Sequence, residues 1–359
     1  MPVVTTTRPR QLPPKTEEEE IRHLKQHEEM LKGYMKKVVL EEEEKKRKKK
    51  MQLEKENKVI QHIAIWEQKI LPFWEEKKSA PETREMCWKY GIPPKLREKI
   101  WVKALGNPLN ITRQMYNSLL EEKNHKLRNG ANKSVDQILL DLPRTFPALS
   151  FFQDHGIGTM SLREVLEAFV LFKPDLGYVQ GMSFIAAALL LNMDTYEAFQ
   201  CMCNILNSNC HSVFYLVDVP KMEQYFVAFD LMLEYYLPNL NKHLREIDLH
   251  PRLYLIDWIL TIFTKSIPID IASHIIDIYF FEGEHFLFRA ALGLLKFLGN
   301  RLFYTDFDES MIMLQSLTAE DIEDHALFGC IKSFNLEEKD LQNFLAMASE
   351  STIDDQTST

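Results

Sequence analysis

The chain of 359 residues lacks the G-x-S-x-G and C-x-x-C motifs that occur in many hydrolases and metal proteins. It has no G-x-S-x-G motif, so a serine hydrolase of the α/β type is not supported. The six histidines between positions 211 and 325 form no H-x-x-x-H pair, and the five cysteines form no C-x-x-C pair. The usual zinc sites are therefore not indicated. An odd number of scattered cysteines is typical of buried thiols in a reducing compartment.

Three further absences narrow the class of protein. The net charge of −9 gives no support to nucleic-acid binding. The first fifteen residues contain no apolar stretch, so we expect no signal peptide. The longest apolar run, which starts at Phe184, is too short to span a bilayer and is interpreted as a core helix. Together these features predict a cytoplasmic protein.

The N-terminal part divides into two segments of different composition. Residues 1–15 are rich in proline, threonine and basic side chains and are predicted to be disordered. Residues 16–66 are rich in Glu, Lys and Arg and contain no proline, which predicts one long charged helix. Thr16 and Glu19 have the spacing of a capping box at its start. The four glutamates at 41–44 each precede a basic residue by four positions, which favours a helix.

A heptad pattern in this segment is incomplete. Its apolar positions are Ile21, Leu24, Leu31, Met35 and Val38, followed after an interruption by Val59, Ile63 and Trp66. The interrupting positions are Glu42, Lys45, Lys49 and Glu56. Three interpretations stay open: a solvated semi-rigid helix, a coiled coil through which residues 16–66 pair with a partner or a second copy, and a helix attracted to membranes by its lysines.

The rest of the chain is predicted to be helical. Residues 67–85 are polar and include Pro81, so we expect a linker there. Residues 86–300 contain apolar segments of helical period, broken by proline and glycine, with little sign of strands. This pattern predicts an all-α domain. A helical extension over 301–348 and a disordered polar tail over 349–359 are expected to follow.

Arg144 is predicted to lie on an irregular, exposed stretch. Pro143 and Pro147 flank it, and proline disfavours helical backbone in the residue that precedes it. The guanidinium is therefore expected to reach outward. Asp141 lies three residues earlier, so a structural ion pair at a helix end is the alternative interpretation.

Gln180 is predicted to lie in a second exposed loop. This loop begins at Pro174, ends at Gly181 and follows a segment with helical apolar spacing. Hydrolysis of GTP in small GTPases needs positive charge near the γ-phosphate and a group that orients water, which Arg and Gln can supply. The chain contains no G-x-x-x-x-G-K-[ST] motif, so a partner would have to carry the nucleotide.

The motifs around these residues match a known pattern. The I-x-x-D-x-x-R-T-F-P motif at 138–147 and the G-Y-x-Q-G-M motif at 177–182 resemble the paired motifs of the TBC domain, the Rab GTPase-activating fold. Segments at 91–101, 254–272 and 284–296 are also similar to that family. The charged N-terminal segment resembles the region before the TBC domain in one branch, which is associated with recycling endosomes and autophagy.

The resemblance implies a GTPase-activating protein that stimulates GTP hydrolysis by a Rab GTPase in vesicle trafficking. Arg144 and Gln180 would be the catalytic fingers, Asp141 would hold Arg144 or its loop, and Tyr178 would pack the Gln180 loop. The protein would need no cofactor of its own, because the Rab carries GTP and Mg²⁺. The protein would be cytoplasmic and would bind peripherally to endomembranes, namely the membranes of recycling endosomes or autophagosomes. The alternative is a catalytically weak Rab effector or scaffold.

Two other parts of the resemblance concern packing. Arg97 and Trp101 match the opening motif of the family. Two interpretations stay open: a core tryptophan with the arginine packed along it, or direct contact of these residues with a partner. Where the family commonly has R-I-W-D, this chain has His274, Ile275, Ile276 and Asp277. This departure is expected to alter packing or partner selectivity.

Overall fold

The computed structural model describes residues 16–126, 133–153 and 156–357, and every regular element within these ranges is a helix. The all-α class predicted from the sequence is confirmed. The chain forms two units, one that ends at Ile65 and one that begins at Trp66. The disorder expected for residues 1–15 lies outside the described residues.

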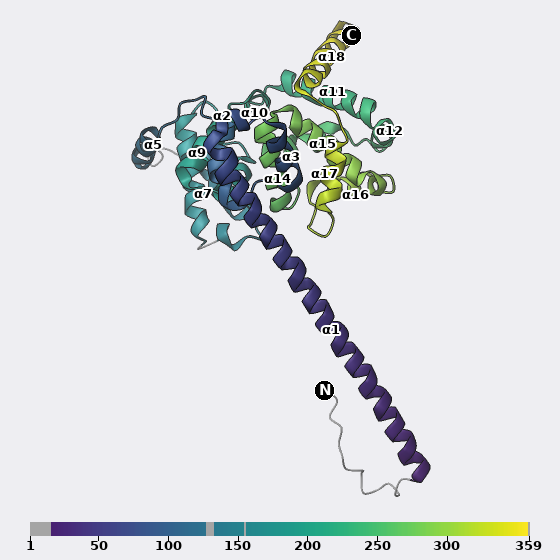
Figure 1. Ribbon diagram of the computed structural model, residues 1–359. Helices are drawn as coiled ribbons and strands as arrows, with labels where there is room; N and C mark the ends of the chain where they lie inside the picture. Colours follow the sequence, from purple (N-terminus) through teal and green to yellow (C-terminus); the bar gives the residue numbers. More distant parts are fainter. Residues whose placement is uncertain (1–15, 127–132, 154–155, 358–359) are drawn as a thin grey trace. The chain divides into compact units, whose positions relative to one another are not determined.

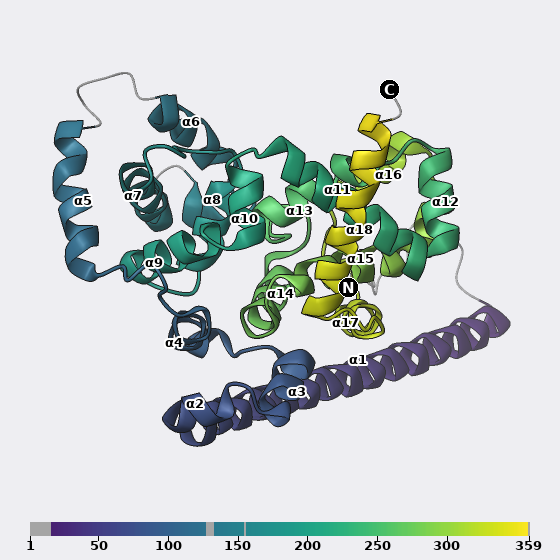
Figure 2. The ribbon, with the colours of Figure 1, turned by 90° about the horizontal axis from the view of Figure 1, so that it is seen from above.

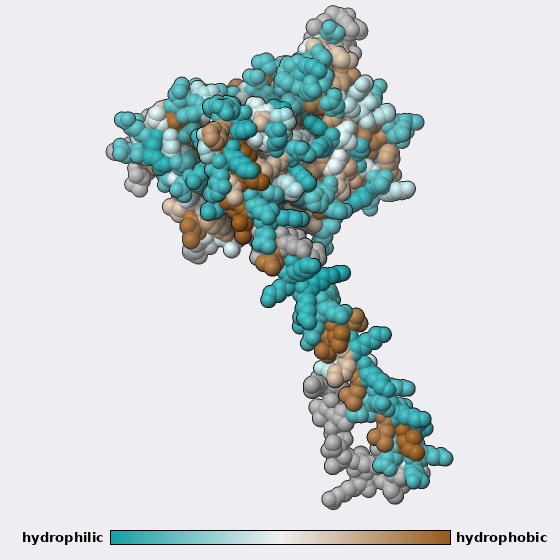
Figure 3. Space-filling model, viewed as in Figure 1, coloured by the Kyte–Doolittle hydropathy of each residue, from teal (hydrophilic) through white to brown (hydrophobic). Residues whose placement is uncertain are grey.

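The first unit contains one long helix, α1 (Glu17–Ile65), drawn as a single rod in Figure 1. The predicted capping box is present: the Glu19 N–H donates to Thr16 Oγ1 at 3.3 Å, and the Thr16 N–H donates to Glu19 Oε2 at 3.4 Å. Apolar side chains such as Leu24 and Met35 are exposed along α1, and brown residues interrupt its hydrophilic surface in Figure 3. Self-pairing through this helix stays a prediction.

The expected linker at 67–85 is wrong, because this segment is helical and packed. A π-helical turn (Trp66–Ile70) and a 3-10 turn (Leu71–Phe73) lead into α2 (Trp74–Lys77) and α3 (Pro81–Tyr90). The rings of Trp66 and Trp74 are buried, with centroids 6.2 and 5.9 Å from the Phe281 ring. Two tryptophans bury enough apolar area to hold an otherwise polar segment to the core.

The next helices carry both predicted site loops. They are α4 (Pro94–Leu105), α5 (Arg113–Lys126), α6 (Lys133–Asp141), α7 (Ile157–Phe172), α8 (Met182–Leu190), α9 (Thr195–Leu206) and α10 (Asn209–Tyr215). The side chains of α8 from Met182 to Leu190 are almost all buried, so the apolar run is a core helix as predicted. In Figure 2, α10 is drawn between α8 and α13.

The C-terminal half consists of longer helices. They are α11 (Val219–Tyr236), α12 (Pro238–Glu246), α13 (Leu255–Thr261), α14 (Ile269–Glu282), α15 (His285–Leu302), α16 (Phe307–Gln315), α17 (Asp324–Lys332) and α18 (Glu338–Thr357). Helix α15 crosses the domain end expected at residue 300, and α18 continues through the expected disordered tail. Leu341, Leu345 and Ala348 are buried on α18, which packs along α11, and a helix nucleated by such packing propagates beyond it.

Two negative findings concern the described residues alone. None of the helices there combines the length and the hydropathy needed to cross a bilayer. No group of three or more His, Cys, Asp or Glu side chains there could hold a metal ion. Four of the five cysteines, Cys87, Cys201, Cys203 and Cys210, are buried free thiols, as predicted.

Candidate functional site at the α6–α7 and α7–α8 loops

Arg144 lies at the end of a single 3-10 turn (Leu142–Arg144) that follows α6. The backbone there is more regular than the sequence predicted, because Pro143 fits the first turn of a helix. The Arg144 side chain is 69% exposed, in agreement with the prediction that it points outward. The next residue, Thr145, is fully buried and donates a hydrogen bond from Oγ1 to the Asp141 carbonyl at 2.8 Å.

Gln180 lies in the loop between α7 and α8, and its side chain is exposed. Gly177 and Gly181 have φ values of 64° and 104°, a conformation that side chains with a Cβ rarely adopt. The loop is fixed at its centre, where the Tyr178 N–H donates to Ser134 Oγ at 3.1 Å. The predicted loop position of Gln180 is therefore confirmed.

Two hydrogen bonds bring the two loops together. The Tyr178 hydroxyl donates to Asp141 Oδ2 at 2.8 Å, and the hydroxyl oxygens of Thr145 and Ser183 are hydrogen-bonded at 2.8 Å. In the chain, Arg144 lies between Asp141 and Thr145. Gln180 lies between Tyr178 and Ser183. The exposed guanidinium and carboxamide thus come from neighbouring segments of one surface.

The Asp141 carboxylate positions the loops more than it neutralises Arg144. The nearest Arg144 nitrogen lies 3.9 Å from Asp141 Oδ1, and an ion pair this exposed contributes little. Burial raises the pKa of the Tyr178 phenol, so its hydroxyl stays protonated and donates to Asp141. The guanidinium is therefore free to meet an anion, and the alternative of a purely structural ion pair is not favoured.

Thr145, Phe146 and Ser183 hold this surface together but were not predicted as site residues. Phe146 has a φ of 46°, which is uncommon for a bulky residue, and its ring packs edge-on against Phe184 with centroids 5.4 Å apart. Both anchors connect the residues after Arg144 to α8. The sequence could have indicated Thr145 and Phe146, because they lie in the R-T-F-P motif. For Ser183 the only indication in the sequence was its position three residues after Gln180.

Arg97 and Trp101 are not part of this surface. Both donate to the fully buried carboxylate of Asp277: Arg97 through Nε and a terminal nitrogen, each at 3.1 Å, and Trp101 through Nε1 at 2.7 Å. The Ile92 N–H adds a fourth bond at 2.9 Å. A buried carboxylate needs such partners. The packing interpretation of the two residues is supported, and partner contact is not.

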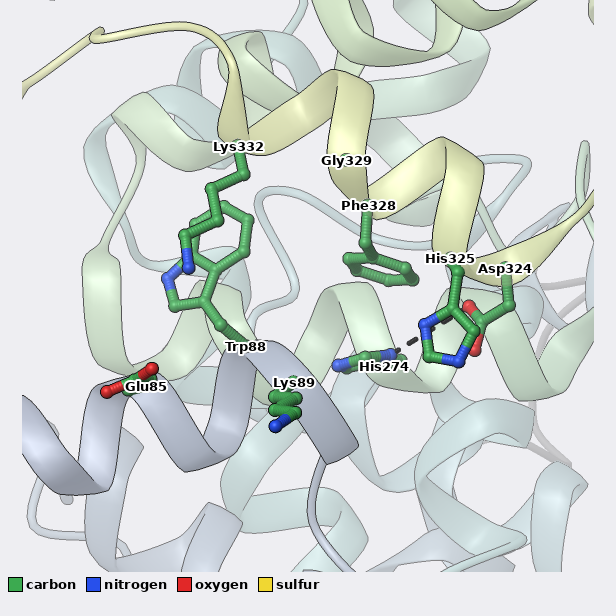
Figure 4. A pocket seen from close by; sticks show the side chains of 9 residues that line it. All are labelled: Glu85, Trp88, Lys89, His274, Asp324, His325, Phe328, Gly329 and Lys332. Carbon is green, nitrogen blue, oxygen red and sulfur yellow. Dashed lines mark ion pairs between the residues drawn. The ribbon is translucent and has the colours of Figure 1, made fainter.

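His274 is a buried residue on α14, three positions before Asp277. The His274 ring stacks on Phe328 with centroids 3.9 Å apart, and its Nε2 lies 2.9 Å from the Cys87 carbonyl oxygen. Figure 4 shows this ring beside Phe328 in a pocket that Trp88 and Asp324 also line. Asp277, which the motif retains together with Ile275, is the buried acceptor of the four hydrogen bonds described above.

The family model of the Rab-GTPase-TBC domain matches residues 94–303 of this chain. The chain belongs to the TBC domain family. It is 37% identical to TBC1 domain family member 12 of Xenopus tropicalis, over 93% of this chain and 51% of that protein. It is also 37% identical to human TBC1 domain family member 14, over 94% of this chain and 51% of that protein. The chain thus spans about half the length of these curated relatives.

Among solved structures, the TBC fold recurs in the Chlamydomonas flagellar RabGAP TBC domain. The two structures agree with a TM-score of 0.62 at 22% sequence identity, over 77% of this chain and 94% of that one. At this identity the likeness concerns the fold alone. The TBC domain of this chain therefore has the helical arrangement of a solved family member.

Proposed function

We propose that this TBC domain stimulates GTP hydrolysis by a Rab GTPase, with Arg144 and Gln180 completing the partner's active site. One observation carries the proposal: two exposed side chains of the right chemistry lie on loops that two hydrogen bonds hold together. Membership in the Rab-GTPase-TBC family supports the choice of partner.

Each residue has a distinct role in this proposal. The Arg144 guanidinium stabilises the charge that develops on the transferred phosphoryl group, and the Gln180 carboxamide accepts and donates hydrogen bonds that orient the attacking water. Asp141 and Tyr178 are positioning residues, because they fix the loops and do not reach the nucleotide. GTP and Mg²⁺ belong to the Rab, since this chain has no phosphate-binding loop motif.

Substitution of Arg144 by alanine tests the proposal. Arginine fingers of Ras and Gα systems contribute about 10³–10⁵ in rate. We therefore expect Arg144→Ala to lower the stimulated hydrolysis rate by at least roughly 10²-fold, while affinity for the GTP-loaded Rab changes little. Single-turnover hydrolysis with a panel of Rabs measures the first quantity, and a nucleotide-state pulldown measures the second.

Arg252 is a matched control, because its side chain is 59% exposed and bonded to Glu223 at 2.8 Å, outside the two loops. Arg252→Ala is expected to stimulate hydrolysis as wild type does. An Arg144→Ala protein that is as active as wild type would overturn the assignment of Arg144.

A second candidate function is that of a Rab effector or scaffold with weak catalysis. The observation that favours it is α1, a 49-residue helix with exposed apolar side chains that suits tethering. Binding of GTP-loaded Rab by the wild-type chain, without faster hydrolysis for any Rab of the panel, would select this candidate.

The site of action is also a proposal. We propose a cytoplasmic protein that acts in vesicle trafficking and is recruited to recycling endosome or autophagosome membranes. The basic run at positions 45–50 and the resemblance of the N-terminal segment support recruitment to an anionic surface. Sedimentation with phosphatidylserine vesicles tests it, and a chain that stays in the supernatant would contradict it.

A further inference from the structure

The turn between α10 and α11 exposes three aliphatic side chains within four residues. Leu216, Val217 and Val219 are 62%, 56% and 63% exposed. Single exposed apolar residues are common on protein surfaces, but a contiguous group marks an interaction site more often. We call these three residues the aliphatic turn.

Val217 is also in a conformation that valine disfavours. Its φ is 55°, in the left-handed region, where a β-branched side chain is a genuine outlier. The Val217 N–H donates to the Phe214 carbonyl at 3.3 Å, and the Asp218 N–H donates to the Val213 carbonyl at 3.1 Å. These two bonds form a Schellman motif, whose left-handed position is usually glycine. Folding therefore favours glycine at this position, and the exposed valine gains nothing from the core.

The aliphatic turn adjoins the loop that carries Gln180. Leu216 lines a cavity together with Asp175 and Leu176, which belong to that loop. The Tyr215 hydroxyl donates to the Leu260 carbonyl, and the Leu260 Cβ lies 3.8 Å from the position that a Cβ at Gly181 would occupy. A protein that covers the α7–α8 loop would therefore meet the aliphatic turn as well.

We propose that the aliphatic turn is the apolar part of the surface that binds the GTP-loaded Rab, beside Gln180. This inference rests on the proposed function and adds a second contact between this chain and the Rab. The partner would contribute an apolar patch that borders its nucleotide pocket. Continuity with the Gln180 loop selects this occupant over an unrelated protein.

Val217→Gly is the decisive substitution, because it removes both the strain and the side chain. The melting temperature of the second unit, followed by tryptophan fluorescence, is expected to rise by roughly 2 °C or more. All five tryptophans lie in that unit. The KM for the GTP-loaded Rab should rise roughly tenfold, because one valine side chain that the partner would bury is lost, while kcat stays unchanged.

Asp248→Gly is the matched control. Asp248 is exposed, has a φ of 56° and occupies the left-handed position of a second Schellman motif. In that motif the Asp248 N–H donates to the Arg245 carbonyl at 3.1 Å, and the Leu249 N–H donates to the Leu244 carbonyl at 2.8 Å. We expect no loss of thermal stability and an unchanged KM. Val219→Asn, at the first residue of α11, should raise KM without a change in melting temperature.

The outcomes separate the two proposals. If Val217→Gly and Val219→Asn retain the wild-type KM, the aliphatic turn is not a partner contact and the proposed function is unaffected. A lower melting temperature of Val217→Gly would contradict the argument from strain and overturn the inference. If the wild-type chain neither binds nor stimulates any Rab of the panel, the proposed function fails and this inference fails with it.

Discussion

Tyr178 connects the two site loops through one hydroxyl group. Its ring is buried, and its hydroxyl reaches Asp141, which starts the turn that carries Arg144. The residue thus connects the two segments that carry Arg144 and Gln180. A change that removes only this hydroxyl reports on the positioning of the loops.

We expect Tyr178→Phe to lower kcat of stimulated hydrolysis about tenfold and to leave KM nearly unchanged. The Asp141 oxygen loses its partner, and such a loss costs about 1 kcal/mol of stability. Stimulated hydrolysis and urea unfolding measure the two effects. Tyr235→Phe, at a residue that is 72% exposed, is the control and should match wild type. A Tyr178→Phe protein with wild-type kcat would show that this hydrogen bond does not position the loops.

His211 makes the stability of the domain depend on pH. Burial lowers the pKa of His211 to about 4, whereas an unfolded histidine has a pKa of about 6.5. The folded state therefore binds fewer protons, so the contribution of His211 to stability is complete above about pH 6.5 and decreases as the pH falls toward 4. At pH 5 the loss is about 2 kcal/mol.

The substitution His211→Gln isolates this effect from other titrating groups. When the pH falls from 7 to 5, the unfolding free energy of the wild type should decrease by about 2 kcal/mol more than that of His211→Gln. Urea unfolding at the two pH values measures it. An equal difference at both pH values would show that His211 is not the group responsible.

At the scale of helices, contact between α15 and α17 depends on a glycine. A Cβ at Gly293 of α15 would lie 2.7 Å from the Cα of Ile331 on α17. The backbone of α17 would have to move, because a Cα is not the end of a flexible side chain. Gly299 lies on the same helix, but the nearest atom to its Cβ position is Leu240 Cδ2 at 3.9 Å, an ordinary contact distance.

We expect opposite effects at these two glycines. Gly293→Ala should destabilise the second unit by about 2 kcal/mol, because overpacking outweighs the gain in helix propensity. Gly299→Ala should be neutral or stabilise by up to about 1 kcal/mol. Urea unfolding followed by tryptophan fluorescence compares the two. A Gly293→Ala protein as stable as Gly299→Ala would mean that α17 shifts freely.

At the scale of the whole molecule, the chain consists of one long helix and one packed unit. The described side chains of α1 are exposed or half-buried, and the core begins at Trp66. Removal of residues 1–60 is therefore expected to change the melting temperature of the second unit by less than about 2 °C. Thermal unfolding of residues 61–359, followed by tryptophan fluorescence, checks this. A large loss would mean that α1 stabilises the domain.

Local patterns were sufficient to predict much of this molecule. The helical class, the capping box of Thr16 and Glu19 before α1, and the two loops that carry Arg144 and Gln180 follow from periodicity, capping residues and proline or glycine positions. The linker at 67–85 was not predicted correctly, because a polar composition does not reveal that Trp66 and Trp74 reach Phe281.

By itself the sequence determined where the helices and the exposed loops lie, because those choices depend on residues a few positions apart. Only the tertiary structure decided that Tyr178 meets Asp141, that Asp277 accepts from Arg97 and Trp101, and that Leu216 lines a cavity with residues of the Gln180 loop. Each of these depends on side chains that are far apart in the chain and meet only when the helices have packed.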